Sequence, residues 1–107
     1  MSSATLINCF EVPDDQDEQF LDLWSRADEL LRSQGGYLTT RLHKALMPGS
    51  RYRYINIAEL DSVETWQAVI TSPEFEAITG QMQQYNPAPG LFTVAAAHTR
   101  QEQPAAR

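Results

Sequence analysis

The clearest indication of the fold is the segment YLTTRLHKALMPGSRYRYINIAEL, which runs from Tyr37 to Leu60. Its two halves, Tyr37–Leu46 and Arg51–Leu60, are rich in β-branched and aromatic residues, and the sequence MPGS lies between them. Strand-forming runs that are separated by a short Pro-Gly turn are typical of a β-hairpin. We therefore expect two antiparallel strands in the middle of the chain.

A strand and a helix are expected before the hairpin. The segment TLINCFEV (Thr5–Val12) has the composition of a strand. From about Asp15 to Ser33, apolar residues recur at spacings of three and four, which predicts an amphipathic helix. The apolar stripe consists of Phe20, Leu23, Trp24, Ala27, Leu30 and Leu31. Gly35 and Gly36 are expected to end the helix in a left-handed cap.

Two helical segments and a strand are expected after the hairpin. Asp61, with Glu64 three residues later, predicts a capping box. Ser72 and Pro73 predict the start of a further helix. The residues expected to face inward from these segments are Val63, Trp66, Ile70, Phe75, Ile78 and Met82. A last strand is expected at Leu91–His98, after the chain-breaking sequence NPAPG.

The predicted order is β-α-β-β-α-β, with the second helix split in two. This order is typical of a ferredoxin-like α+β fold, in which helices cover one face of an antiparallel sheet. A chain of 107 residues is long enough for one domain and too short for two. We assign the domain to residues 1–99 and expect residues 100–107 to form a polar C-terminal tail.

The predicted strands are apolar on both faces, although the helices are expected to cover only one. In the first strand Leu6 and Phe10 lie on one face, and Ile7 and Cys9 lie on the other. A sheet face that meets water normally carries polar residues. The expected cover is a second copy of the chain, so the sequence predicts a symmetric homodimer whose sheets pack face to face.

Composition and charge exclude several classes of partner. The net charge is −6, from 14 acidic and 8 basic residues, and such an excess repels nucleic acid and anionic membranes. No apolar run approaches the roughly 20 residues that span a bilayer, and the N-terminus lacks the features of a secretory signal. We therefore expect a cytoplasmic protein. Its single cysteine, Cys9, excludes an internal disulfide.

Three polar residues interrupt otherwise apolar strands: Asn8, His43 and Asn56. Each could serve the fold alone, by bonding to the backbone or by lying at a wetted edge. Together, beneath aromatic and aliphatic side chains, they predict an apolar pocket with few polar groups, which is how small-molecule sites are built. The predicted walls are Tyr54, Trp66, Phe75 and Ile78. We find no paired carboxylates and no cluster of metal ligands, so chemistry in this pocket would depend on hydrogen bonding and proton transfer.

From about Thr5 to Thr99 the chain resembles the antibiotic biosynthesis monooxygenase family, whose members are small dimeric α+β barrels. The resemblance rests on Asn8 and on the segments GGYLTTRLH, YINIAELDSVETW and SPEF. It implies oxidation of an aromatic anthrone-type polyketide by molecular oxygen without a metal or flavin. It further implies that Asn56 holds a phenolate, that His43 accepts a proton, and that Asn8 orients the substrate.

The chain departs from the family pattern at two positions. Leu60 stands where members carry a tryptophan. Thr79 stands at about the position where polyketide-tailoring members carry a basic residue and where the haem-degrading branch carries an iron-binding histidine. Haem degradation is therefore disfavoured, although Asn8 matches the asparagine of that branch. Two alternatives remain open at this point. One is a non-catalytic dimeric module that binds a small ligand or assists a pathway partner, and the other is polyketide cyclisation in the same pocket.

Overall fold

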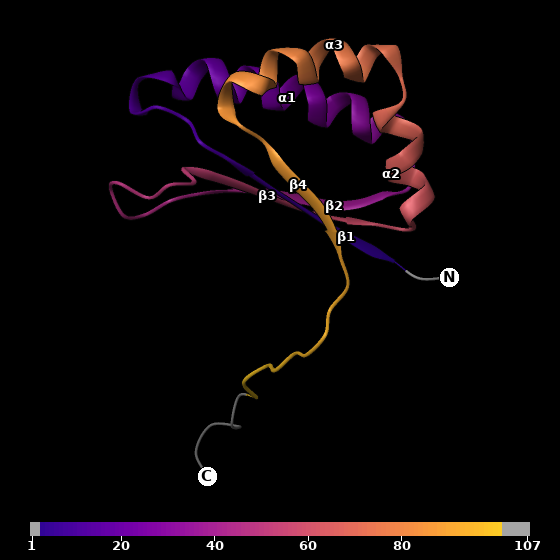
Figure 1. The fold of residues 1–107 in the computed structure, drawn as a ribbon. Helices are drawn as coiled ribbons and strands as arrows, with labels where there is room; N and C mark the ends of the chain where they lie inside the picture. Colours follow the sequence, from indigo (N-terminus) through magenta and orange to yellow (C-terminus); the bar gives the residue numbers. More distant parts are fainter. Residues whose placement is uncertain (1–2, 102–107) are drawn as a thin grey trace.

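The computed structural model describes residues 3–101. Four antiparallel strands form one sheet in the order β2-β3-β1-β4, and helices α1, α2 and α3 all lie on one side of it (Figure 1). This arrangement confirms the predicted ferredoxin-like α+β fold. The elements are β1 (Ala4–Phe10), η1 (Asp14–Gln16), α1 (Asp17–Ser33), β2 (Tyr37–Lys44), β3 (Tyr54–Leu60), α2 (Val63–Ile70), α3 (Pro73–Met82), η2 (Gln83–Tyr85) and β4 (Ala88–Phe92). The end of the predicted tail, residues 102–107, lies outside the described residues.

Strand β4 lies earlier in the chain than predicted. It begins at Ala88, inside the sequence NPAPG, and ends at Phe92, so the predicted range of Leu91–His98 was wrong. In β4, Pro89 lies opposite Asn8 of β1. An edge strand has one side without strand partners, and a proline there sacrifices no ladder hydrogen bond. A Pro-Gly sequence therefore does not exclude a strand at this position.

The cap of α2 also differs from the prediction by one residue. The N-cap is Ser62, whose Oγ accepts a hydrogen bond from the backbone N–H of Thr65 at 3.2 Å. Asp61 lies outside the helix, and its carboxylate accepts from the hydroxyls of Ser62 and Thr65 instead. Ser72 caps α3 in the predicted manner, because its Oγ accepts from the backbone N–H of Phe75 at 3.2 Å.

The join between α1 and β2 determines where Tyr37 lies. Gly35 and Gly36 have φ angles of 77° and 81°, which confirms the predicted left-handed end of α1. The carbonyl of Gly36 accepts a hydrogen bond from the backbone N–H of Asp61 at 2.9 Å. A Cβ on Gly36 would collide with the side chains of Thr65 and Asp61. The start of β2 is therefore packed closely against the start of α2.

A bulge between Tyr37 and Thr39 breaks the simple alternation of β2. Strand parity alone places Tyr37 on the face of Thr39 and His43. The extra residue of the bulge turns Tyr37 to the other face, where it packs against a cluster formed by Leu6, Ala58 and Leu60. Thr39 and His43 stay on the face that the helices leave uncovered, because they lie opposite Glu59 and Ile55 of β3.

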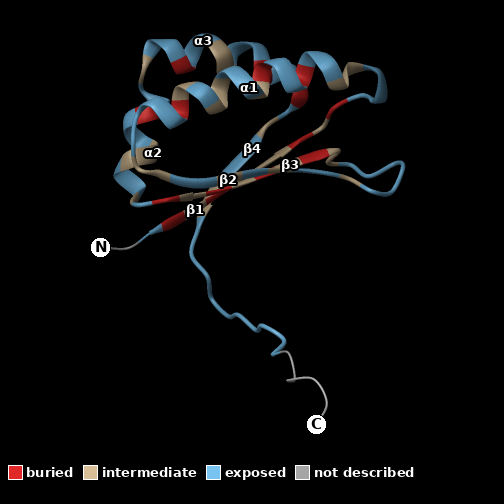
Figure 2. Ribbon diagram, turned by 180° about the vertical axis from the view of Figure 1, so that it is seen from behind, coloured by how far each residue is buried: buried red, intermediate tan, exposed pale blue. Residues whose placement is uncertain are grey.

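The two faces of the sheet differ in burial, because buried and partly exposed residues alternate along β3. Figure 2 shows the buried residues of the strands in red. In β3 the residues that face the helices are buried, whereas Ile55, Ile57 and Glu59 on the other face are partly exposed. We call this second surface the open face. Its apolar side chains are Ile7, Cys9, Ile55, Ile57 and Phe92. Among residues 3–101, the structure contains no helix with the length and apolar composition needed to cross a membrane.

One end of the layer between helices and sheet is filled by aromatic rings, and we call it the packed end. It consists of Phe10, Val12, Phe20, Leu23, Tyr54, Met82 and Tyr85. The ring of Phe20 is stacked on Tyr54 with centroids 4.7 Å apart and meets Tyr85 edge-on at 5.3 Å. Such aromatic contacts contribute beyond the area that they bury.

An ion-pair cluster closes the packed end. Arg53 donates to both oxygens of Asp17, from Nε at 2.8 Å and from Nη2 at 2.9 Å, and the hydroxyl of Tyr54 donates to the same carboxylate at 2.9 Å. These donors, first Arg53 and then Tyr54, hold the pKa of Asp17 well below its usual range. The cluster ties the first turn of α1 to the start of β3.

Candidate functional site

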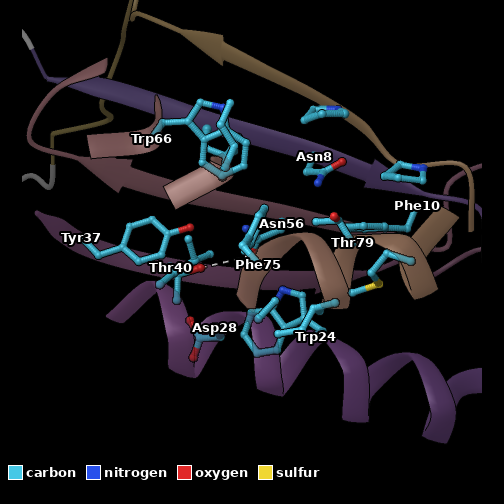
Figure 3. Close-up of a pocket in the computed structure, with 18 of the residues that line it drawn as sticks. Asn8, Phe10, Trp24, Asp28, Tyr37, Thr40, Asn56, Trp66, Phe75 and Thr79 are labelled. Atoms are coloured by element: carbon cyan, nitrogen blue, oxygen red, sulfur yellow. Dashed lines mark hydrogen bonds between the residues drawn. The ribbon is translucent and has the colours of Figure 1, made fainter. Parts of the chain in front are cut away.

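A pocket of about 330 Å³ lies between the sheet and the helices, next to the packed end (Figure 3). Its volume is at the lower end of the range for small-molecule sites. Much of its wall is apolar, with Trp24 from α1, Trp66 from α2, and Phe75 and Ile78 from α3. The rings of Trp66 and Phe75 meet edge-on with centroids 5.9 Å apart.

Two asparagines lie at the floor of the pocket. Asn8 of β1 and Asn56 of β3 are directly opposite each other in the ladder, so their side chains project side by side. The hydroxyl of Thr40 in β2 donates to Oδ1 of Asn56 at 3.1 Å. Among the described residues, the amide nitrogen of Asn56 and the buried Oδ1 of Asn8 have no hydrogen-bond partner. The floor therefore contains an amide donor group on Asn56 and an amide oxygen on Asn8 that no described residue satisfies.

A carboxylate and a phenol lie farther along the wall. Asp28 on α1 receives a hydrogen bond from Nε of Arg32 at Oδ2, at 3.0 Å, while its Oδ1 is buried without a partner among the described residues. The hydroxyl of Tyr37 is likewise buried and unpartnered within that part of the chain. Burial, and after it the charge of Asp28, raises the pKa of Tyr37 above its ordinary value. Tyr37 is therefore a neutral hydrogen-bond donor.

Five of the seven residues predicted for the site line this pocket: Asn8, Asn56, Trp66, Phe75 and Ile78. The structure does not bring His43 to them, because it is exposed on the open face opposite Ile55. Tyr54 faces the helices but belongs to the packed end, where its hydroxyl bonds to Asp17. Neither is therefore placed to contact a ligand in the pocket.

Four polar residues of the pocket were missed by the sequence analysis: Asp28, Tyr37, Thr40 and Gln83. Asp28 could have been found, because it lies four residues after Trp24 and three before Leu31, within the apolar stripe of α1. Tyr37 could not, because only the bulge turns it inward. Of the two departures from the family pattern, Thr79 lines the pocket, whereas Leu60 is buried against Leu6 and Ala58.

The described residues hold no cluster of three or more His, Cys, Asp or Glu side chains that could bind a metal ion. The pocket instead combines an apolar wall with separate amide, hydroxyl and carboxylate groups. Such an arrangement can bind an aromatic molecule by its faces and orient it by hydrogen bonds to a few polar atoms.

Solved structures with the same architecture include three informative ones. A candidate monooxygenase from Shewanella loihica PV-4 is 29% identical, with a TM-score of 0.69 over 90% of this chain and 97% of that one. A variant of SnoaB, a cofactor-independent oxygenase from Streptomyces nogalater, is 18% identical, with a TM-score of 0.77 over 91% and 97%. A dimeric ferredoxin-like protein of unknown function from Jannaschia sp. CCS1 is 12% identical, with a TM-score of 0.72 over 87% and 100%.

No curated protein matches the chain. The model of one family does match, and it covers residues 3–81, which include β1, the β2–β3 hairpin and nearly all of the pocket-lining helices. The chain belongs to the antibiotic biosynthesis monooxygenase family.

Proposed function

We propose that this protein is a cofactor-independent monooxygenase that oxidises an aromatic polyketide, or a related phenolic compound, with molecular oxygen. One observation carries the proposal: the amide of Asn56 is buried in an aromatic-walled pocket, its Oδ1 is bonded to Thr40, and its N–H groups are left for a ligand. The family membership and the likeness to SnoaB support the same class of reaction.

The proposed reaction begins with loss of a proton from a bound phenol or anthrone. The resulting anion passes an electron to oxygen, and the two radicals combine to form a carbon–oxygen bond. In the oxidation of an anthrone methylene to a quinone carbonyl, one oxygen atom becomes the carbonyl and the other leaves as water with the two methylene hydrogens. The reaction therefore needs no reductant.

The role proposed for Asn56 is to stabilise the substrate anion. A donor that is already oriented in a pocket of low polarity interacts strongly with developing negative charge, because little reorganisation is needed. Thr40 fixes the orientation of the amide by occupying its oxygen. Asn8 is proposed to orient the substrate through its unpartnered Oδ1, and Trp66, Phe75 and Ile78 are proposed to wall the ring system.

The first test is oxygen uptake by purified, metal-free protein with anthrone as the substrate. We expect uptake together with formation of anthraquinone, and Asn56→Ala should lower kcat by roughly 10²–10³-fold. Gln67→Ala removes an exposed amide on α2 and is the matched control. Asn56→Ala with full turnover would rule out the proposed role. Binding of anthrone without oxygen uptake would instead favour a ligand-binding module.

His43→Ala tests the other catalytic role predicted from the sequence. Because His43 lies on the open face, the proton acceptor that the sequence analysis proposed is separated from the pocket by the sheet. If His43 accepts the substrate proton, its loss should lower kcat. An unchanged kcat in His43→Ala would exclude that role.

We also propose that the protein is a homodimer whose open faces pack together. The open face carries Ile7, Ile55, Ile57 and Phe92, and dimeric ferredoxin-like proteins have the same fold. Ile57→Lys should therefore give a monomer by sedimentation at micromolar concentration, because it would bury a charge in the interface. Leu21→Lys changes an exposed leucine of α1 and should leave the dimer intact. A monomeric wild-type protein would contradict the proposal.

A further inference from the structure

Two buried polar atoms in the pocket wall, one from a strand and one from a helix, have no hydrogen-bond partner within the described residues. They are the hydroxyl of Tyr37, at the start of β2, and Oδ1 of Asp28, in the middle of α1. Both residues line the pocket (Figure 3), and the negative charge of Asp28 contributes to the raised pKa of the Tyr37 hydroxyl. A buried polar atom without a partner destabilises the fold unless something else supplies the hydrogen bond.

Only one oxygen of the Asp28 carboxylate, Oδ2, receives a hydrogen bond from the described residues. Arg32, one turn later on α1, donates to Oδ2 at 3.0 Å, and its side chain is 64% exposed. The side chain of Asp28 is 13% exposed, so its other oxygen is turned away from the solvent. The same spacing recurs at Asp22 and Arg26 on this helix, but there the carboxylate is 62% exposed and lies outside the pocket.

The phenol of Tyr37 is also held in a defined position. Gly36 packs against the start of α2, and the bulge after Tyr37 turns its ring toward the helices. The ring packs on Leu6, Ala58 and Leu60, and its hydroxyl is buried without a partner among the described residues. Because burial and the neighbouring negative charge keep the phenol protonated, it remains a donor.

A neutral donor and a carboxylate oxygen that both lack a partner, lining the same pocket, select one kind of chemical group. A hydroxyl can accept a hydrogen bond from the phenol and donate one to the carboxylate, whereas a carbonyl or ether can only accept. A ligand carboxylate would be repelled by the charge of Asp28. We infer that Tyr37 and Asp28 form a subsite that binds a hydroxyl group of the substrate, accepting from Tyr37 and donating to Asp28.

The inference rests on the proposed function, because it takes this pocket to be the substrate site. It adds a substrate class: aromatic compounds that carry a second hydroxyl, and no carboxylate, away from the oxygen bound by Asn56. Tyr37 and Asp28 are then positioning residues that determine specificity. The test therefore measures binding rather than turnover.

The first experiment is calorimetric titration of the full chain with 2-naphthol and with 2,6- and 2,7-dihydroxynaphthalene. We expect at least one dihydroxy compound to bind roughly tenfold more tightly than 2-naphthol, since its second hydroxyl is positioned by two hydrogen bonds together, one from Tyr37 and one to the charged Asp28. Tyr37→Phe should reduce this preference to about twofold or less, with little change for 2-naphthol. Tyr85→Phe removes another buried, unpartnered hydroxyl, outside the pocket, and should keep the full preference.

The second experiment uses Asp28→Asn and naphthalene-2,6-dicarboxylate. Whichever way this compound enters, one carboxylate meets Asp28, so the wild-type protein should bind it at least tenfold more weakly than the dihydroxy compound. Asp28→Asn should remove most of that discrimination, whereas Asp22→Asn, at the exposed pair, should retain it. Thermal unfolding of each variant identifies any loss of fold.

Equal binding of 2-naphthol and both dihydroxy compounds to the wild-type protein would overturn the inference, as would an unchanged preference in Tyr37→Phe. These outcomes are independent of catalysis. A hydroxyl preference that depends on Tyr37 and Asp28, without oxygen uptake from anthrone, would support the subsite and contradict the proposed monooxygenase. Oxygen uptake without the preference would do the reverse.

Discussion

The two ends of the layer between α1 and the sheet differ in how they satisfy a carboxylate. At the packed end, Asp17 receives hydrogen bonds from Arg53 and Tyr54 at both oxygens. In the pocket, Asp28 receives one hydrogen bond, from Arg32 to Oδ2, and its buried Oδ1 has no partner among the described residues. The floor of the pocket repeats this pattern, since Asn8 has an unpartnered oxygen.

This difference separates groups that serve the fold from groups that are available to a ligand. A satisfied carboxylate such as Asp17 contributes to stability and offers nothing further to bind. An unsatisfied one such as Asp28 costs folding free energy, and a ligand that completes its hydrogen bonds recovers that cost on binding. Tyr85 is an exception, because its hydroxyl is buried and unpartnered at the packed end.

Truncating a side chain at the packed end should destabilise the fold more than truncating one beside the pocket. Phe20 is fully buried among aromatic rings, so Phe20→Ala should lower the free energy of unfolding by about 3–5 kcal/mol. Phe75 borders the pocket, and Phe75→Ala should cost at most about half as much, because one side of its ring faces unfilled space rather than packed atoms. Urea unfolding of both variants measures the difference. Equal losses would mean that the pocket is packed as tightly as the other end.

An intermediate effect is expected from the ion-pair cluster, and it depends on pH. The pKa of Asp17 lies well below its ordinary value of 3.8 in the folded protein, so the unfolded chain takes up a proton first as the pH falls. The stabilisation is therefore complete above about pH 5 and is lost progressively below about pH 4. Asp17→Asn should lower Tm at pH 7 and flatten this acid dependence. Asp22→Asn, at an exposed pair, should leave both unchanged.

The smallest expected effect concerns the two unpartnered phenols. Removing a buried hydroxyl that makes no hydrogen bond deletes a desolvation cost, so Tyr85→Phe and Tyr37→Phe should each leave stability unchanged or raise it by up to about 1 kcal/mol. Chemical denaturation of both variants checks this. A loss of more than 1 kcal/mol in Tyr85→Phe would show that its hydroxyl is bonded, and the exception at the packed end would disappear.

The element order and the two asparagines at the pocket floor could be predicted from the sequence. Apolar spacing located α1, and strand parity placed Asn8 on the same face as Leu6 and Phe10. The structure shows that this face is the one covered by the helices. Parity did not reveal which face of β2 meets the helices, so it could not separate His43 from Asn56. These residues lie on opposite faces, because Asn56 is opposite Leu42, the residue before His43.

The remaining errors arose where tertiary context decides the local structure. The bulge after Tyr37 has no local sequence signal, and it reverses the face of that side chain. Pro89 is compatible with a strand only because β4 is at the edge of the sheet, which depends on the pairing of the whole chain. The hydrogen bonds of Tyr54 depend on Asp17, which is 37 residues away.

The chain contains two tryptophans, Trp24 and Trp66, and both line the pocket. Its ultraviolet emission therefore comes from indole rings on opposite walls of the cavity, on α1 and α2. An aromatic guest would displace water from those rings and quench or shift the emission. The protein thus carries its own optical probe of occupancy, and compound libraries can be screened against it without any label.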